Sequence, residues 1–245
     1  MKPITVLWSD GVSEAEAKES IGAMRDFLRY LRGVADEQDI GLAPIVLRPY
    51  GNWILKGTAG KEAYHSFRWY WESSLDQNSG QVSAATFIEI VRFEPWQHVD
   101  PHLDLALLHT ELRNDTTETE GDFPSVFACT EPDLVTVISI RHLSQIADCD
   151  LRLKCLRSLV MHNFGHLVGL PLGLQTTKKH TISESVVDAK TRGRTCALPC
   201  IMYEAQSIDE LMAIATARED DSPFLCELCQ EVMREIVFTL HFSPN

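Results

Sequence analysis

The order of apolar segments predicts an α/β fold in which one domain, residues 1–245, contains a mixed sheet with packed helices. Three observations support this prediction. Short apolar runs of strand length alternate with longer segments whose apolar residues recur at helical spacing. The chain has 245 residues, 44% of them hydrophobic, which is enough to bury a substantial core. No internal repeat is visible.

The first third of the chain is expected to begin with a strand and a long helix. Ile4–Trp8 is an apolar run of strand length. Ser13 and Glu16 form a capping box, which satisfies free amides at a helix start, and this helix should continue to about Ala35. The further elements expected here are strands at Ala43–Leu47 and Asn52–Leu55, helices at Tyr64–Trp71 and Ser83–Arg92, and an irregular connector from Pro95 to Pro101.

The rest of the chain should complete the sheet and add three helices. The helix that carries the most informative residues is expected from Asp150 to Val168, because its apolar residues recur at helical spacing. Asp148 and Asp150 lie near the positive end of its dipole. The other elements expected here are strands at Leu103–Leu108, Val126–Cys129 and Val135–Ile140, an acidic surface loop at Arg113–Asp122, a polar insertion at about 173–195, and helices at Ile208–Ala217 and Phe224–Leu240.

Charge and hydropathy exclude two classes of partner. Thirty-five acidic residues against 22 basic ones give a formal charge of -13, and the basic residues are scattered, so no stripe for a phosphate backbone is present. Nucleic acid is therefore not expected as a partner. No run is long and apolar enough to cross a bilayer, and residues 1–11 lack the pattern of a signal peptide, so no membrane contact and a cytoplasmic location are expected.

Two histidines at helical spacing suggest a catalytic metal site. His162 and His166 stand four residues apart, so their rings project from one face of the expected helix, as two imidazoles that share a zinc ion do. Gly169 and the later Met202 match the order of the metzincin motif H-E-x-x-H-x-x-G-x-x-H and its Met-turn. The alternative is structural: both rings bond neighbouring carbonyls, and Met202 packs beneath them.

Four clustered cysteines suggest a second, structural metal site. Two pairs on separate segments are the usual way to assemble a closed tetrahedral thiolate site for zinc. The alternatives are two disulfides, four buried thiols, or a redox-active pair, which a reducing cytoplasm and the absence of a preceding thioredoxin-like strand disfavour. Cys129, Cys149 and Cys155 are expected to pack as small hydrophobes. The predicted zinc ligands are Cys196, Cys200, Cys226 and Cys229.

These motifs together resemble the archaemetzincin family of zinc peptidases, from roughly Leu103 to Cys229. The resemblance rests on Val135–Leu143, the histidine helix, and then four cysteines in order around the Met-turn: Cys196, Cys200 just before Met202, and the pair Cys226 and Cys229. It implies a metzincin-like single domain with a zinc-stabilised C-terminal segment. It also implies a third histidine followed directly by a cysteine, and a glutamate general base directly after the first histidine.

The chain departs from the family pattern at the base and at the third ligand. Asn163 occupies the position of the base, and a neutral amide cannot accept a proton from metal-bound water. Leu172 stands three residues after Gly169, and an aliphatic side chain cannot bind zinc. If the polar stretch is an insertion within the motif, the third ligand should be the residue before Cys196, which is Thr195 and not a histidine, so both placements fail. The residues of the insertion that could replace the ligand are His180, Glu184 and Asp188.

Three functional hypotheses follow. The first is a pseudopeptidase with one structural zinc and a second zinc that is held weakly or lost; its old substrate cleft, beneath the strand Val135–Ile140, would bind a peptide or a protein partner by strand addition. The second is an active zinc metallopeptidase, aminopeptidase-like or an endopeptidase, with a substitute third ligand and base. The third is a structural subunit of a larger assembly.

Overall fold

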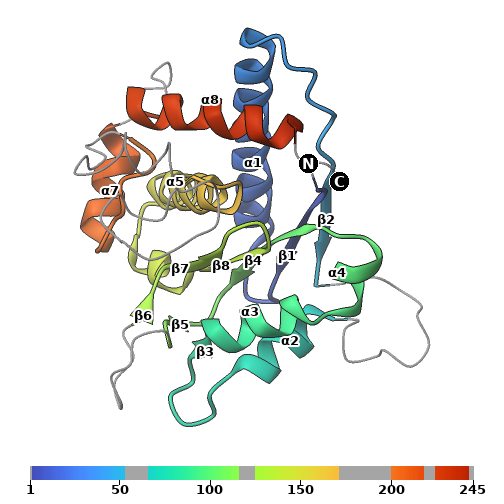
Figure 1. Cartoon of the computed structure of the whole chain (residues 1–245). Helices are drawn as coiled ribbons and strands as arrows, with labels where there is room; N and C mark the ends of the chain where they lie inside the picture. Colours follow the sequence, from blue (N-terminus) through green and yellow to red (C-terminus); the bar gives the residue numbers. More distant parts are fainter. Residues whose placement is uncertain (1, 53–65, 116–124, 171–199, 218–223, 243–245) are drawn as a thin grey trace.

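A five-stranded mixed sheet forms the centre of the protein (Figure 1). The computed structural model describes residues 2–52, 66–115, 125–170, 200–217 and 224–242, and side chains as far as residue 238. The strand order is β2-β1-β4-β8-β7, in which the first four strands run parallel and β7 is antiparallel to β8. Their bounds are Leu47–Gly51, Ile4–Trp8, Leu103–Leu108, Val135–Ser139 and Ala128–Glu131, respectively. The predicted α/β class with a mixed sheet is confirmed.

Helices cover both faces of this sheet (Figure 1). One face packs against α1 (Glu14–Glu37), α5 (Cys149–Leu167), α7 (Ile208–Ala217) and α8 (Glu227–Phe242). The other face packs against α2 (Phe67–Ser74), α3 (Ala84–Arg92) and α4 (Pro95–Val99). A small second sheet, in the order β3-β5-β6, is formed by Val82–Ser83, Leu112–Arg113 and Ser125–Val126.

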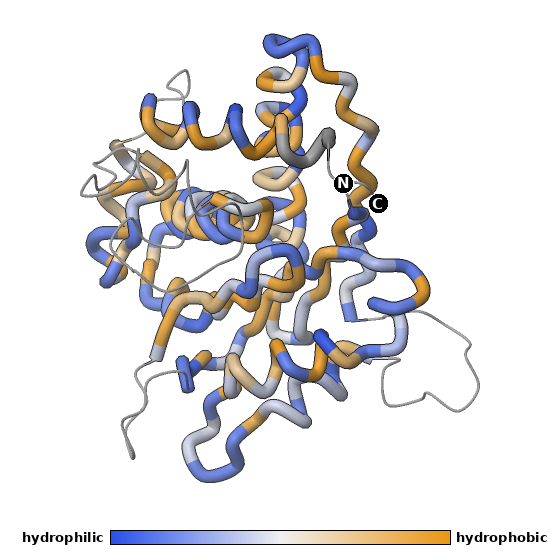
Figure 2. Tube along the Cα trace, in the orientation of Figure 1, coloured by the Kyte–Doolittle hydropathy of each residue, from blue (hydrophilic) through white to orange (hydrophobic). Residues whose placement is uncertain are grey.

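Strand β4 explains why the sheet needs helices on both sides. All six of its residues are buried. Leu103, Leu105 and Leu107 belong to the core beneath α1 and α5, whereas Ala106 and Leu108 belong to the core beneath α2 and α3. This alternation follows from the two-residue period of a strand. Figure 2 shows the same distribution, with hydrophobic residues concentrated in the central strands and hydrophilic ones at the outer turns.

The two longest helices begin where the sequence predicted and pack on each other. Ser13 Oγ accepts a hydrogen bond from Glu16 N at 3.3 Å, and Ser13 N donates to Glu16 Oε2 at 2.8 Å, so the predicted capping box is present. In α5, the carboxylate of Asp148 accepts from two backbone amides of the first turn. Arg157 of α5 forms ion pairs with Glu19 and Asp26 of α1. These contacts fix the helix that carries both predicted histidines.

Several predicted element boundaries are wrong, most of them by one to three residues. The second strand is Leu47–Gly51 rather than Ala43–Leu47, and as an edge strand it accommodates Pro49. The strand expected at Val126–Cys129 is divided at Phe127, where the chain passes from the small sheet to the large one. The final helix begins at Glu227 rather than at Phe224.

Two short helices lie where the sequence gave no periodic signal. The connector between the two prolines contains α4, with Pro95 in its first turn, where a missing amide costs nothing. A 3₁₀ helix follows β8 at Arg141–Gln145. The expected strand Asn52–Leu55, the start of the aromatic helix, most of the acidic loop and the insertion lie outside the described residues. None of the described helices is long and apolar enough to cross a bilayer.

Candidate metal centres and cleft

A cleft of about 650 Å³ lies between α5, α7 and the strands β6 and β7. Its walls include Phe127, Ala128 and Thr130 from the strands, and Tyr203 and Glu204 from the segment that leads to α7. The remaining residues of interest in its wall are His142, His162, Asn163, His166 and Ile201. The predicted histidines therefore lie at the wall of a cleft between these elements.

His162 and His166 face each other through their Nε2 atoms, which are 3.0 Å apart. His162 Nδ1 lies 2.9 Å from Ile201 O, and His166 Nδ1 lies 3.0 Å from Leu170 O. Only an N–H can satisfy a carbonyl, so each Nδ1 carries a proton and each Nε2 presents a lone pair. Two lone pairs at this distance need a shared cation between them. In a tetrahedral zinc site two imidazole nitrogens lie about 3.3 Å apart, so the pair is close to metal-binding geometry.

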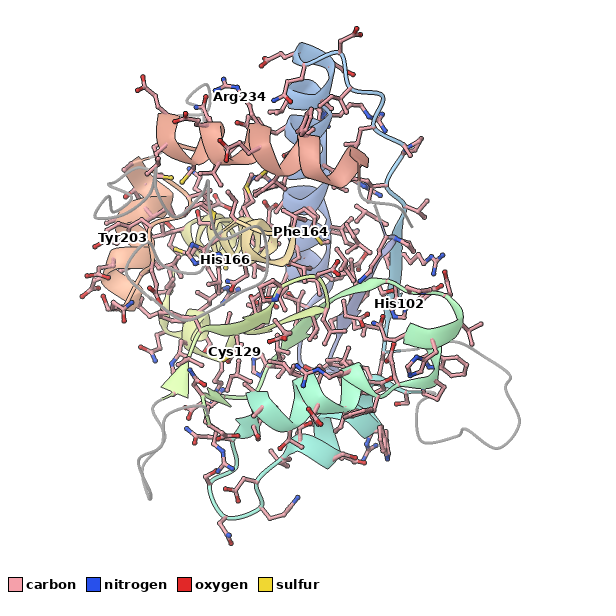
Figure 3. The ribbon with its side chains drawn as sticks, viewed as in Figure 1. His102, Cys129, Phe164, His166, Tyr203 and Arg234 are labelled. Carbon is pink, nitrogen blue, oxygen red and sulfur yellow. The ribbon has the colours of Figure 1, made fainter. Side chains whose placement is uncertain are left out.

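Burial keeps both imidazoles neutral. Burial and the neighbouring His162 together lower the pKa of His166 to about 3, against the opposing effect of Leu170 O. Burial also lowers the pKa of His162, in part opposed by the carbonyl of Ile201 and the charges of Glu204 and Cys200. Neutral imidazole is the form that binds metal. Figure 3 shows His166 on α5 next to the sheet.

Asn163, at the predicted base position, is hydrogen-bonded to its own helix and to a neighbouring strand. Its Nδ2 donates to Leu159 O at 2.8 Å, and its Oδ1 accepts from Thr130 Oγ1 at 3.2 Å. Thr130 Oγ1 lies 2.7 Å from Thr136 Oγ1 on the neighbouring strand. The side chain is 5% exposed. Asn163 therefore links α5 to the edge strand β7, a role that the sequence did not reveal.

Met202 and two glycines shape the ends of the histidine helix. Gly169 has a φ of 109°, which confirms that a glycine is needed where the chain leaves α5. Met202 is buried against α5: a Cβ at Gly165 would lie 2.7 Å from Met202 Sδ. Gly165 was not singled out in the sequence, although its place within the histidine motif was a usable signal. The methionine packs under the histidine turn, as both readings of the motif required.

A third protein ligand for the histidine pair is absent from the part of the chain that the structure describes. No third histidine, cysteine, aspartate or glutamate donor atom there completes a group with His162 and His166. Leu172 and Thr195, the two aligned positions, lie outside the described residues, as do the possible substitutes His180, Glu184 and Asp188. Glu204, which the sequence reasoning did not consider, is exposed in the cleft wall and is close enough to His162 to affect its pKa.

Three of the four predicted thiolates converge. The Sγ atoms of Cys200, Cys226 and Cys229 lie within 4.8 Å of one another, and those of Cys200 and Cys229 are 3.8 Å apart. A disulfide would require about 2.05 Å, whereas two thiolates on a tetrahedral zinc ion at about 2.3 Å lie about 3.8 Å apart. Cys226 N also donates to Cys200 Sγ at 3.4 Å. The donor set fits zinc, and Cys196 lies outside the described residues.

The three cysteines outside this site differ in their exposure to solvent. Cys155 is buried and Cys129 is half-buried, which fits the expected packing role, and burial raises the pKa of these thiols to about 11 and about 12. Cys149 is exposed in the first turn of α5, so the expectation that it packs as a small hydrophobe is wrong. Its apolar neighbours in the sequence face the core, whereas its own position on the helix faces solvent.

A second titratable cluster lies on the opposite face of the sheet. His102 Nε2 is 3.0 Å from Glu94 Oε1 and 3.5 Å from Asp104 Oδ2, and all three side chains are buried. Burial lowers the pKa of His102, but the contact with Glu94 and the charge of Asp104 outweigh this and raise it to about 9. Burial raises the pKa of Asp104 to about 8 against the charge of His102. The sequence reasoning missed this cluster because its members show no motif spacing.

Comparisons with known proteins give a likeness among solved structures. No protein-family model and no curated protein matches the chain. A solved structure, a zinc-dependent peptidase from Methanocorpusculum labreanum (strain Z), is similar with 17% sequence identity and a TM-score of 0.49; the match covers 94% of this chain and 99% of that one.

Proposed function

We propose that this chain is a zinc-binding protein of the archaemetzincin type that has lost peptide hydrolysis and binds an extended peptide or partner segment in its cleft. The observation that carries the proposal is the state of Asn163. It lies in the cleft wall, but its amide is neutral, buried and hydrogen-bonded to Leu159 and Thr130, so it cannot accept a proton from water. General-base catalysis contributes about 10²-fold to 10⁴-fold in rate, and this residue cannot supply it.

Two zinc sites of unequal strength belong to the proposal. The thiolate site, with Cys200, Cys226 and Cys229 described and Cys196 as the proposed fourth ligand, is closed and structural: a zinc ion there would hold the start of α8 against the segment after α5. The pair His162 and His166 keeps its facing lone pairs. With only two protein ligands, it would hold zinc more weakly than a three-ligand site does.

The peptide would bind along β7 rather than beneath β8. Strand addition needs an unpaired edge, and β8 has β4 on one side and β7 on the other, so the location expected from the sequence is wrong. Among the described residues no strand pairs with the outer side of β7. Phe127, Ala128 and Thr130 line the cleft at this edge. A peptide added here would pass the histidine pair.

The alternative function is an active zinc metallopeptidase with a substitute base. One observation favours it: Glu204 is an exposed carboxylate in the wall of the same cleft, and its charge acts on His162. In that case Glu204 would take the proton that Asn163 cannot take, and the third ligand would come from residues outside the described part of the chain.

Metal analysis distinguishes the two functions. Zinc is counted by mass spectrometry in the purified wild type and in the Cys229→Ser and His166→Gln variants. The proposal expects tightly held zinc that Cys229→Ser removes and His166→Gln leaves in place. Tightly held zinc that His166→Gln removes, together with chelator-sensitive cleavage of unfolded casein by the wild type, would support the active enzyme. Loss of that cleavage in Glu204→Gln would then identify the base.

Restoring the carboxylate alone should not restore catalysis. In Asn163→Glu the third ligand is still not provided, so we expect no chelator-sensitive cleavage of unfolded casein above the wild-type level. Cleavage by this variant that is at least about 100-fold faster, the lower end of what a general base contributes, would contradict the proposal and show that the missing base was the only defect.

Binding without cleavage is tested at the cleft wall. Labelled unfolded casein should bind the wild type in a fluorescence anisotropy titration and remain intact. Ala128→Trp places a large ring in the cleft and should weaken binding at least about tenfold, which is about 1.4 kcal/mol. Ala15→Trp, at an exposed position of α1, is the matched control and should bind as the wild type does. Equal binding by the Ala128→Trp and Ala15→Trp variants would show that β7 is not the binding site.

A further inference from the structure

The cluster of Glu94, His102 and Asp104 lies away from the cleft and depends on different residues. Glu94 is the N-cap of α4, His102 follows that helix, and Asp104 is the second residue of β4. Asp104 alternates with Leu103 and Leu105, so it points to the face that α2, α3 and α4 cover. Figure 3 shows His102 beside α4, well separated from His166.

The donor atoms of the three side chains converge on one point. His102 Nε2, a Glu94 oxygen and an Asp104 oxygen all lie within 4.8 Å of one another, and the side chains are 6%, 2% and 2% exposed. Ligands of a metal ion with bonds of about 2.1 Å are separated by about 3.0 to 3.4 Å. The distances of 3.0 and 3.5 Å from His102 Nε2 to the two oxygens match this separation.

The imidazole is oriented as a metal ligand is. His102 Nδ1 lies 2.7 Å from Asp100 O, and since only an N–H can satisfy that carbonyl, Nε2 faces the two carboxyl groups. A ligating histidine usually donates its other N–H to a carbonyl in this way. The carboxyl groups are held as well: Tyr70 Oη donates to Glu94 Oε2 at 2.5 Å, and Gln97 Nε2 donates to Asp104 Oδ2 at 3.4 Å.

One buried atom in this cluster has no hydrogen-bond partner. Among the described residues, Glu94 Oε1 accepts no well-aligned hydrogen bond, and its one printed contact is the ion pair with His102 Nε2 at 3.0 Å. A buried carboxylate oxygen without a partner is costly. A cation between Glu94 Oε1, His102 Nε2 and Asp104 Oδ2 would satisfy all three atoms, and a divalent ion would balance the two carboxylates.

We propose that Glu94, His102 and Asp104 form a buried binding site for a divalent transition-metal ion. One imidazole and two carboxylates are a donor set that manganese and zinc accept, whereas an all-oxygen set would favour magnesium or calcium. The site is closed to solvent, so its role is to tie α4 and α2 to the sheet rather than to bind substrate. The proposal holds whether or not the cleft is catalytic.

Manganese is the probe, because thiolates bind it poorly and the cysteine site therefore does not compete. The full-length chain is produced with Mn²⁺ supplied while it folds, since the cluster is buried, and is then desalted. Electron paramagnetic resonance counts the bound ion, and pulsed measurements detect coordinating nitrogen. We expect one bound Mn²⁺ per chain with one imidazole nitrogen, unchanged in His166→Gln.

The variants keep the shape of the cluster and remove one ligand each. Glu94→Gln, Asp104→Asn and His102→Gln should each weaken Mn²⁺ binding at least about tenfold, the smallest loss typical even for residues that only support a ligand. His98→Gln, on the exposed side of α4, is the matched control and should bind normally. Near-ultraviolet circular dichroism checks folding. A wild type without bound Mn²⁺, or with Mn²⁺ that lacks nitrogen coupling, would overturn the proposal, as would unchanged binding in folded variants.

Discussion

Two buried histidines on opposite faces of one sheet respond to burial in opposite ways. His102 and His166 are each 5% exposed. Burial lowers the pKa of His166 to about 3, whereas the pKa of His102 is raised to about 9. The difference lies in their neighbours: His166 faces another imidazole and a carbonyl, while His102 faces two carboxyl groups. The charge of a buried group is thus set by its partners more than by its depth.

The largest expected effect is the loss of the imidazole from the carboxyl cluster. In metal-free protein, His102→Ala should lower the free energy of unfolding by about 3 to 5 kcal/mol, because the carboxyl groups of Glu94 and Asp104 lose their cation in a dry site. Urea denaturation followed by circular dichroism measures this change. His98→Ala, at an exposed position nearby, should change stability by less than about 0.5 kcal/mol. Similar losses in the two variants would contradict the charge assigned to His102.

A smaller effect is expected at the other histidine. His166→Ala should lower the free energy of unfolding of metal-free protein by about 1 to 3 kcal/mol, since it leaves Leu170 O without its side-chain donor but uncovers no charge. The same denaturation series gives the value. If His166→Ala lowered the free energy of unfolding more than His102→Ala does, the assignment of a neutral state to the histidine pair would be wrong.

The pH dependence of the free energy of unfolding should show the protonation of both His102 and His166. The folded pKa of His102 is raised above that of the unfolded chain, so its contribution is complete below about pH 6.5 and is lost as the pH rises to about 9. The contribution of His166, whose folded pKa is lowered, is instead lost as the pH falls below about 6.5. Each group changes stability by about 1.4 kcal/mol per pH unit within its window. Asp104, whose folded pKa is raised to about 8, adds to the alkaline loss as the pH rises to about 8. Denaturation of metal-free wild type from pH 5 to 9 measures the slopes, and the double variant His102→Gln/Asp104→Asn should flatten the alkaline one.

The smallest effect is expected where α5 meets Met202. A Cβ at Gly165 would lie 2.7 Å from Met202 Sδ and 3.0 Å from Leu170 Cδ1. Because a methionine end is flexible, Gly165→Ala should cost only about 1 kcal/mol. It should nevertheless reduce zinc held at His162 and His166, without changing zinc at the cysteines, in a metal titration of both sites. Equal losses at both sites would indicate a general folding defect.

The sequence predicted those features whose signals are local. The strands Ile4–Trp8 and Leu103–Leu108 and the helix Ile208–Ala217 have the predicted bounds, because an apolar run or a helical period is visible within a few residues. The facing of His162 and His166 followed from a spacing of four on one helix.

Features that depend on tertiary contacts were missed. The cluster on α4 and β4 joins residues that follow no common period, and only the short turn of α4 brings Glu94 to His102. The division of a strand at Phe127 reflects a choice between two sheets that no local pattern encodes. The hydrogen bond between Asn163 and Thr130 likewise depends on where β7 lies. The sequence showed that Asn163 lacks a proton-accepting group, and the structure shows that its side chain links α5 to β7 instead.

The two histidines also contact the two described backbone carbonyls on either side of residues 171–199. Leu170 O, just before this segment, contacts the ring of His166, and Ile201 O, just after it, contacts the ring of His162, while the rings contact each other. Both ends are therefore anchored by α5.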